Sequence, residues 1–155
     1  MSVRFVEGDI LDAGENIIAH QVNCLGGFGS GLAGQIAEKW PECKKKYQDV
    51  TESYYGHADD LLGKVCWWNM DKDRWIANVY GQYRFGRSKA LYTDYDSLKN
   101  GLENVEQFAS TYGFSVAIPY GIGCGLGGGD WQGVVLPMIL DIFEKSDVEV
   151  KIHMR

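Results

Sequence analysis

The chain has 155 residues, a length that suits one domain with one hydrophobic core. Hydrophobic residues make up 45% and charged residues 23%, a composition that excludes a disordered protein. The formal net charge of -6 disfavours nucleic acid as a partner, because affinity for a polyanion comes largely from Lys and Arg.

The sequence carries no signal for secretion or for a membrane. Its N-terminus lacks a basic start followed by an apolar run, and no window is apolar enough to span a bilayer. The four cysteines show neither CxxC pairs nor metal-ligand spacing. We therefore expect a cytoplasmic monomer with free thiols, without a metal ion or another cofactor.

In chain order, the first elements are two strands and a helix. Residues 3–6 alternate between apolar and polar, and residues 17–22 form the mostly apolar run of a buried strand. Leucine, isoleucine and tryptophan at positions 32, 36 and 40 have helical spacing. Ser30 is a plausible N-cap of that helix, and Pro41 ends the pattern.

The rest of the chain alternates strands with helices. The segment 43–62 is polar and aromatic and predicts helix with loops, while residues 71–73 predict a hairpin turn. Pro137 should make the last helix irregular. The further expected elements are strands over 64–70, 74–80, 114–118 and 148–153, and helices over 95–108 and 131–144.

These elements predict an α/β fold over residues 1–155 as one domain. About six strands interleave with about four helices, an order typical of a sheet sandwiched between helical layers. The hairpin predicts that the sheet is mixed, because its two strands must be antiparallel.

Glycine is the unusual component of the composition. Twenty glycines are nearly double the usual frequency of about 7%. Each of two clusters follows a strand and precedes a helix, where unpaired backbone N–H groups bind phosphate. We therefore expect one cleft for a diphosphate or a phosphate-sugar. The clusters are Gly26, Gly27, Gly29, Gly31 and Gly34, then Gly121, Gly123, Gly125, Gly127, Gly128 and Gly129.

Two other interpretations of these glycines stay open. Residues 29–34 match the GxGxxG pattern of dinucleotide-binding enzymes, but the region of Asp49 and Glu52 lacks the strand that should precede an acidic ribose ligand. An NAD enzyme is therefore the weaker alternative. The glycines could also serve tight turns alone, an explanation that fits one cluster better than two.

Three stretches together resemble the macrodomain family, the ADP-ribose-binding modules. The first is Gly8-Asp9-Ile10, and the second runs from His20-Gln21-Val22-Asn23-Cys24 through the glycines to Leu32-Ala33. The third runs from Pro119 to Asp130-Trp131. The resemblance covers nearly the whole chain. The most similar subgroup contains ADP-ribose-1″-phosphate phosphatases and terminal ADP-ribose protein glycohydrolases.

The resemblance implies a three-layer α/β/α fold, ADP-ribose as ligand and no metal. It implies that Asp9 and the Ile10 N–H contact adenine and that Asn23 faces the distal ribose. In the phosphatase branch it implies His20 and Asp130 as the catalytic pair. The implied ligand-binding residues are Gly8, Asp9, Ile10, Asn23, Gly29, Ser30, Gly31, Leu32, Pro119, Ile122, Gly123, Cys124, Gly125 and Leu126.

The chain departs from the glycohydrolase branch at two positions. That branch has a lysine after the strand that here ends at Tyr80, and an aspartate in the second phosphate loop. This chain has Gly81-Gln82 and Gly127 there. Neither glycine nor glutamine offers a nucleophilic amine, so a lysine-dependent hydrolase is disfavoured.

Each candidate side chain also has a purely structural interpretation. His20 could be a hydrogen-bonded core histidine, and Asp130 could be a plain N-cap. Cys24 and Cys124 are better explained as small packed thiols than as nucleophiles. An aromatic platform for adenine could lie among Phe28, Tyr83 and Tyr120, but the sequence does not place it.

Three functions remain open from the sequence. The chain could be a phosphatase acting on ADP-ribose-1″-phosphate, or a module that binds ADP-ribose without turnover. It could also be a hydrolase that removes ADP-ribose from modified macromolecules. Phosphate release separates the first from the second, and release of free ADP-ribose identifies the third.

Overall fold

A six-stranded mixed sheet forms the centre of the molecule. The computed structural model describes residues 3–86, 88 and 90–154. The strand order is β1-β6-β5-β2-β4-β3, and among the described strands only β3 is antiparallel to its neighbour. The predicted mixed sheet is therefore confirmed. The strands are β1 (Val3–Val6), β2 (Ile17–Asn23), β3 (Val65–Asp71), β4 (Arg74–Gln82), β5 (Val116–Pro119) and β6 (Val150–His153).

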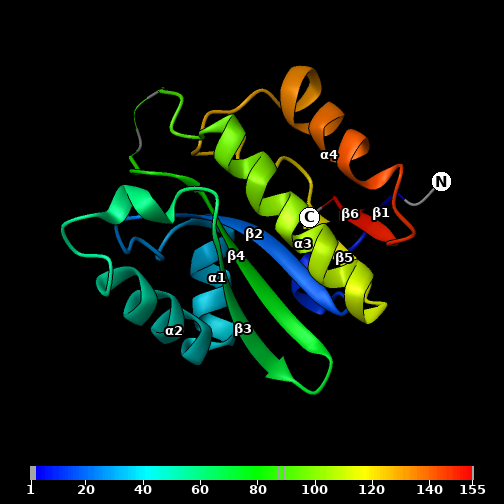
Figure 1. Ribbon diagram of the computed structural model, residues 1–155, viewed down its shortest axis with the longest axis horizontal. Helices are drawn as coiled ribbons and strands as arrows, with labels where there is room; N and C mark the ends of the chain where they lie inside the picture. The colour runs from blue at the N-terminus through cyan, green and yellow to red at the C-terminus, as the bar shows by residue number, and fades with distance from the viewer. Residues whose placement is uncertain (1–2, 87, 89, 155) are drawn as a thin grey trace.

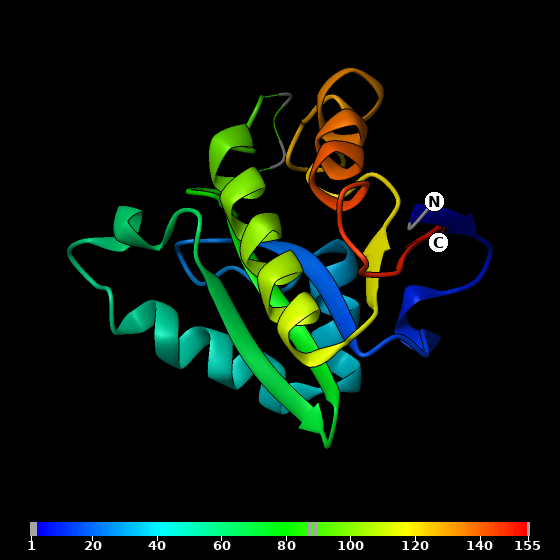
Figure 2. The same cartoon turned by 45° about the vertical axis from the view of Figure 1, so that its right-hand side comes forward.

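Helices cover both faces of the sheet, which confirms the three layers. Helices α3 and α4 lie over one face, and α1 and α2 lie over the other (Figures 1 and 2). None of the helices in the described ranges is long and apolar enough to cross a bilayer. The helices are α1 (Gly31–Lys39), α2 (Pro41–Glu52), α3 (Tyr95–Tyr112) and α4 (Leu136–Phe143), with short helical turns η1 (Ile10–Asp12), η2 (Ala58–Leu61) and η3 (Trp131–Val135).

The core is divided into two clusters by the sheet. The helical spacing of Leu98, Leu102 and Val105 places these fully buried side chains of α3 in the cluster beneath α3 and α4. Ile36 of α1 and Tyr47 of α2 lie in the cluster on the opposite face. Burying a large aliphatic side chain contributes roughly 1.5–3 kcal/mol, so these two apolar faces hold the layers together.

The two helix-associated prolines act at helix starts. Helix α1 ends at Lys39, as Pro41 predicts, but Pro41 also opens α2, which begins earlier than expected. Proline suits the first turn because its missing N–H would have no intrahelical partner there. Pro137 lies in the first turn of α4, directly after the π-helical turn η3, so the predicted irregularity of the last helix is confirmed.

Candidate functional site

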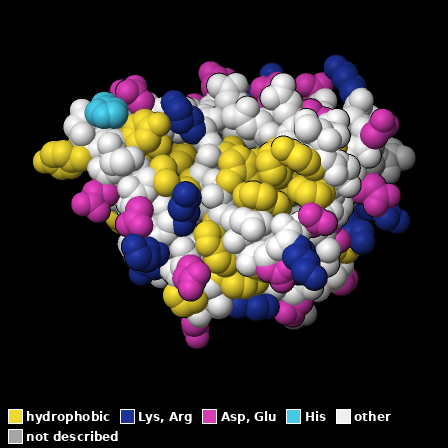
Figure 3. Space-filling model, turned by 60° about the horizontal axis from the view of Figure 1, so that its bottom comes forward, with side chains coloured by type: hydrophobic (Ala, Val, Ile, Leu, Met, Phe, Trp, Pro, Cys, Tyr) yellow, Lys and Arg dark blue, Asp and Glu magenta, His cyan; other side chains and the backbone are white. Residues whose placement is uncertain are grey.

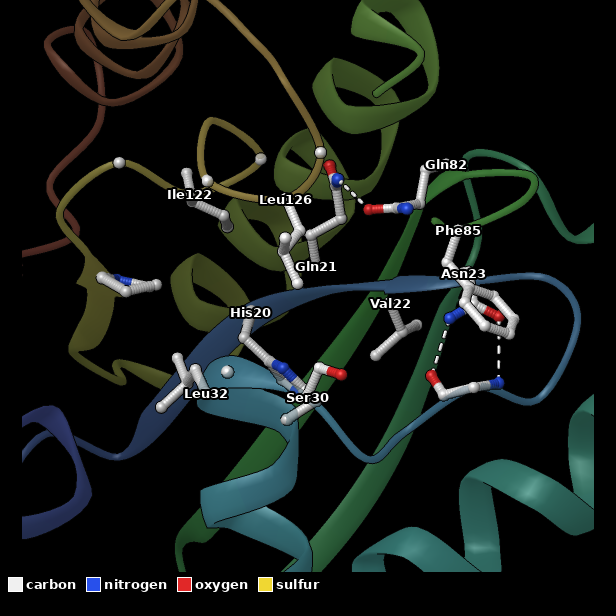
Figure 4. A pocket seen from close by; sticks show the side chains of 18 of the residues that line it. His20, Gln21, Val22, Asn23, Ser30, Leu32, Gln82, Phe85, Ile122 and Leu126 are labelled. Atoms are coloured by element: carbon white, nitrogen blue, oxygen red, sulfur yellow. Dashed lines mark hydrogen bonds between the residues drawn. The ribbon is translucent and has the colours of Figure 1, made fainter. Parts of the chain in front are cut away.

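A cavity of about 470 Å³ lies at the carboxyl ends of β2, β4 and β5, a volume within the range of small-molecule sites. Both glycine-rich segments contribute to its wall, as predicted (Figure 4). The lining residues are His20, Gln21, Val22, Asn23, Gly27, Gly29, Ser30, Gly31, Leu32, Ala33, Gln82, Phe85, Gly86, Pro119, Tyr120, Gly121, Ile122, Gly123, Gly125, Leu126 and Gly127.

The first glycine-rich loop, residues 24–30, is folded around the side chain of Asn23. Its Oδ1 accepts from the N–H groups of Leu25 and Gly27 at 2.9 and 3.1 Å and from the Tyr47 hydroxyl at 3.1 Å. Its Nδ2 donates to the Gly27 carbonyl at 2.6 Å. Because these bonds occupy most of the Asn23 side chain, it shapes the loop that borders the cavity. Contact of Asn23 with a ribose stays a prediction.

The start of α1 presents backbone N–H groups to this cavity. Ser30 is the N-cap residue in an extended conformation, as predicted, but its side chain makes no capping hydrogen bond. The first-turn amides of Gly31, Leu32 and Ala33 have no intrahelical acceptor by helix geometry, and these residues line the cavity. Such a helix start is a site for an anionic oxygen.

The second glycine-rich loop, residues 120–130, is held by backbone hydrogen bonds. Gly121, Gly123 and Gly128 have φ values of +78°, +73° and +77°, a region that favours glycine. The Gly127 carbonyl accepts from the N–H groups of Tyr92 and Thr93 at 2.8 and 3.0 Å. Within the described residues, the amides at positions 125–127 donate to no acceptor, so they are available to a ligand.

His20 lies at the cavity wall but is 2% exposed. Its Nε2 is 2.6 Å from Asn78 Oδ1, and Asn78 Nδ2 donates to the Cys66 carbonyl at 2.9 Å. Asn78 Oδ1 is therefore an acceptor, so His20 carries its proton on Nε2 and leaves Nδ1 as the acceptor. Burial lowers the pKa of His20 to about 4, against the effect of the Asn78 bond. At neutral pH this histidine can accept a proton but has no extra proton to donate.

Asp130, the predicted partner of His20, lies outside the cavity lining. It is exposed and caps η3, where Oδ1 accepts from the Gly133 N–H at 2.9 Å. The N-cap interpretation of Asp130 thus describes its position. The structure does not bring the two residues together in the cavity, and the catalytic pair remains a prediction.

Four predicted ligand-binding residues are also absent from the cavity lining. Gly8, Asp9 and Ile10 follow β1, which is separated from β5 by β6. Asp9 Oδ1 accepts from the Leu11 N–H at 3.0 Å, and Ile10 is buried. Cys124 belongs to the second loop, but its thiol donates to the Ile122 carbonyl at 3.3 Å.

One of the three candidate aromatic rings lines the cavity. Phe28 is buried against His20 and Tyr47, with ring centroids at 5.6 and 4.8 Å, so it is not an exposed platform. Tyr83 is partly exposed but does not line the cavity. Tyr120 lines the cavity, is 42% exposed and lies next to Phe5. It is the candidate that agrees best with the geometry.

The cysteines of the two loops, Cys24 and Cys124, behave as packed thiols. Burial raises the pKa of Cys24 to about 12, with a smaller contribution from Asp59. Burial also raises the pKa of Cys124 to about 11, with Asp130 adding to it. A thiol with such a pKa is protonated at neutral pH and is a poor nucleophile.

At the first of the two departures from the glycohydrolase pattern, a neighbouring side chain occupies the space beside Gly81. A Cβ at Gly81 would overlap Gln21 Oε1, so glycine there makes room for the Gln21 carboxamide. The nearest lysine along the chain, Lys89, lies outside the described residues. Sequence reasoning did not assign Gln21, Gln82 or Phe85 to the site. Their signal was a position at or just beyond the carboxyl ends of β2 and β4, the edge where ligands bind in α/β sheets.

The described lining of the cavity contains no Lys, Arg, Asp or Glu. Nor do the described residues include a group of three or more His, Cys, Asp or Glu side chains that could hold a metal ion. On the face in Figure 3, basic and acidic side chains are interspersed around apolar patches. An anion in this cavity would therefore be held by backbone amides and neutral side chains.

Comparisons with known proteins support the family resemblance, although no protein-family model matches the chain. An ADP-ribose 1″-phosphate phosphatase from Saccharomyces cerevisiae is 37% identical over 65 residues, which are 41% of this chain and 35% of the yeast protein. A DNA ADP-ribosyl glycohydrolase from Mycobacterium tuberculosis is 26% identical over 97% of this chain and 42% of its own length. Both alignments span less than half of the relative. A solved macrodomain protein from Streptomyces coelicolor is 27% identical, with a TM-score of 0.81 and 99% of each chain covered. The chain therefore has the macrodomain fold, and its resemblance to the macrodomain family is confirmed.

Proposed function

We propose that this chain binds ADP-ribose in the cavity and hydrolyses the phosphate of ADP-ribose-1″-phosphate. The observation that carries the proposal is the convergence of two sets of backbone amides, from the start of α1 and from residues 125–127, on one cavity. Neutral N–H groups and a helix start bind phosphate without a cationic side chain. The similarity to a yeast phosphatase supports the choice of substrate.

His20 is the side chain to which we assign proton transfer. Water attacks phosphorus, the bond from phosphorus to the ribose oxygen breaks, and the water's proton passes to neutral His20 Nδ1 as the ribose oxygen takes up a proton from solvent. We assign His20 the role of a base and not of an acid, because buried His20 has no second proton to donate at pH 7. With charge stabilised by amides alone in the described lining, we expect slow turnover.

The test measures ADP-ribose binding by titration calorimetry and phosphate release from ADP-ribose-1″-phosphate. Gly29 and Gly14 make a matched pair, because a Cβ at either meets nothing within 4 Å and neither has a positive φ. Only Gly29 lines the cavity. We expect one-to-one binding that Gly29→Val weakens by at least about tenfold, or 1.4 kcal/mol, and that Gly14→Val leaves in place. Binding without phosphate release would leave a module that only binds ADP-ribose.

Removal of ADP-ribose from modified DNA is the second candidate. It is favoured by the alignment of the Mycobacterium tuberculosis glycohydrolase, which extends along 97% of the chain, further than that of the yeast phosphatase. Against it, Gln21 fills the space that a side chain at Gly81 would need. Release of free ADP-ribose from ADP-ribosylated DNA, without phosphate release from the monoester, would replace the first proposal by the second.

A further inference from the structure

A chain of side-chain hydrogen bonds crosses the β4 end of the cavity. Gln82 Nε2 donates to the Arg84 carbonyl at 2.8 Å, and Gln82 Oε1 accepts from Gln21 Nε2 at 2.7 Å. Gln21 Nε2 also donates to Thr93 Oγ1 at 2.9 Å, and Thr93 Oγ1 donates to the Gly123 carbonyl at 2.6 Å. Figure 4 shows the carboxamides of Gln21 and Gln82 directed toward each other.

The carbonyls at the two ends fix the direction of every bond in this chain. A carbonyl can only accept, so the Thr93 hydroxyl donates its one proton to the Gly123 carbonyl and accepts a hydrogen bond from Gln21 Nε2. Likewise, the Gln82 nitrogen must face the Arg84 carbonyl, which turns its oxygen toward Gln21. Gln21 thus uses both of its N–H protons. Gln82 uses one, and its second N–H has no acceptor among the described residues.

The surrounding backbone holds this chain in place. A Cβ at Gly81 would overlap Gln21 Oε1, and one at Gly123 would lie 3.0 Å from the same atom, so glycine at both positions admits the Gln21 carboxamide. Thr93 also donates its backbone N–H to the Gly127 carbonyl at 3.0 Å. The position of the Gln82 carboxamide is therefore fixed relative to the second glycine-rich loop.

Gln82 lies at the end of the cavity where the distal sugar of the proposed ligand would be. The resemblance assigns adenine to Asp9 after β1, and the sheet order places β4 beyond β5 and β2 from that strand. Asn23, the residue expected at the distal ribose, pairs with Gln82 in the β2–β4 register. The guanidinium of Arg84 lies over the Tyr92 ring at 4.6 Å, and Arg84 is not part of the lining.

We propose that Gln82 is a specificity-determining residue, which donates its second N–H to an oxygen of the phosphate monoester on the distal ribose. Gln21 is the positioning residue that holds the Gln82 carboxamide with its nitrogen outward. The proposal rests on the proposed function, because it takes ADP-ribose-1″-phosphate as the ligand. It adds a side chain that distinguishes the monoester from ADP-ribose.

The test compares the dissociation constant for ADP-ribose, by calorimetry, with the KM for ADP-ribose-1″-phosphate, by phosphate release. Gln82→Glu replaces a donor by a negative charge and should raise the KM by at least about tenfold, while ADP-ribose binding changes less than about threefold. Gln82→Lys should lower the KM. Gln48→Glu, on the exposed surface of α2, carries the same charge change away from the cavity and should alter neither quantity.

Gln21→Leu tests the positioning role, because it removes both donated protons at similar volume. It should raise the KM for the monoester without raising the dissociation constant for ADP-ribose, a split that general loosening of the fold would not produce. If Gln82→Glu raised the KM for the monoester and the dissociation constant for ADP-ribose equally, or changed neither, this inference would be overturned while the proposed function stayed intact. Failure of the wild type to bind ADP-ribose would overturn both.

Discussion

The first glycine-rich loop is held by one side chain, that of Asn23, whereas the second is held mainly by backbone hydrogen bonds. Asn23 makes four hydrogen bonds to the first loop and to Tyr47. The second loop depends on three left-handed glycines and on carbonyls that accept from the segment before α3. We therefore expect a single substitution at Asn23 to disturb the first loop. In the second loop, we expect the damage to come from Cβ atoms added at its glycines.

Removing the Asn23 side chain should produce the largest effect on stability. Asn23→Ala leaves the N–H groups of Leu25 and Gly27 without their acceptor and should lower the free energy of unfolding by about 4 kcal/mol, at 1–3 kcal/mol for each unsatisfied group. Urea unfolding measures this loss, and calorimetry should show no ADP-ribose binding. Asn69→Ala, on the exposed hairpin, is the matched control. A loss no larger than that of the control would show that the first loop keeps its conformation without the Asn23 side chain.

His20, in the strand β2 that leads into the first loop, should make stability depend on pH. Its pKa is about 4 in the folded chain and 6.5 when unperturbed, so the unfolded chain binds a proton first as the pH falls. The contribution of neutral His20 to the free energy of unfolding is complete above pH 6.5. It is lost as the pH falls toward 4, which lowers the free energy of unfolding by roughly 3 kcal/mol. His20→Gln keeps a hydrogen-bonding amide beside Asn78 but does not titrate. Urea unfolding at pH 7 and pH 4 should show the larger loss in the wild type, and equal losses would contradict the buried neutral state.

In the second loop, Gly127→Ala and Gly125→Ala should differ. A Cβ at Gly127 would lie 2.6 Å from the Gly123 carbonyl oxygen, whereas a Cβ at Gly125 meets nothing within 4 Å. Neither glycine has a positive φ, so the comparison isolates space from backbone strain. We expect Gly127→Ala to lower the free energy of unfolding by about 2 kcal/mol and Gly125→Ala by a few tenths. Equal melting temperatures of the two variants would show that the loop can move to admit the methyl group.

The fold could be predicted because its signals are local. Alternation predicts strands, helical spacing predicts α1 and α3, and the hairpin residues 71–73 predict the antiparallel pair. Pro41 was interpreted only as a helix end, since its second role as the first residue of α2 depends on how the chain turns there.

The site was predicted only where one segment supplies it. The two glycine clusters are visible as such, but Gln21 and Gln82 are 61 residues apart and meet only through the β2–β4 register. Asp9 and Asp130 were expected from the resemblance, and their carboxylates accept from nearby backbone N–H groups at helical turns. A polar residue beside a strand end thus has two explanations that sequence alone does not separate.

Asp130, at the end of the second loop, should give a smaller effect on stability than Asn23, His20 or Gly127, and the clearest separation of two roles. Asp130→Ala should cost about 1 kcal/mol because the Gly133 N–H loses its cap, whereas Asp130→Asn retains an acceptor and most of the stability. Phosphate release from the same two variants then reports on chemistry apart from folding. Because the carboxylate lies outside the cavity lining, Asp130→Asn should lower release less than His20→Ala does. The reverse order would mean that Asp130 reaches the phosphate in the complex and that the second loop closes on its ligand.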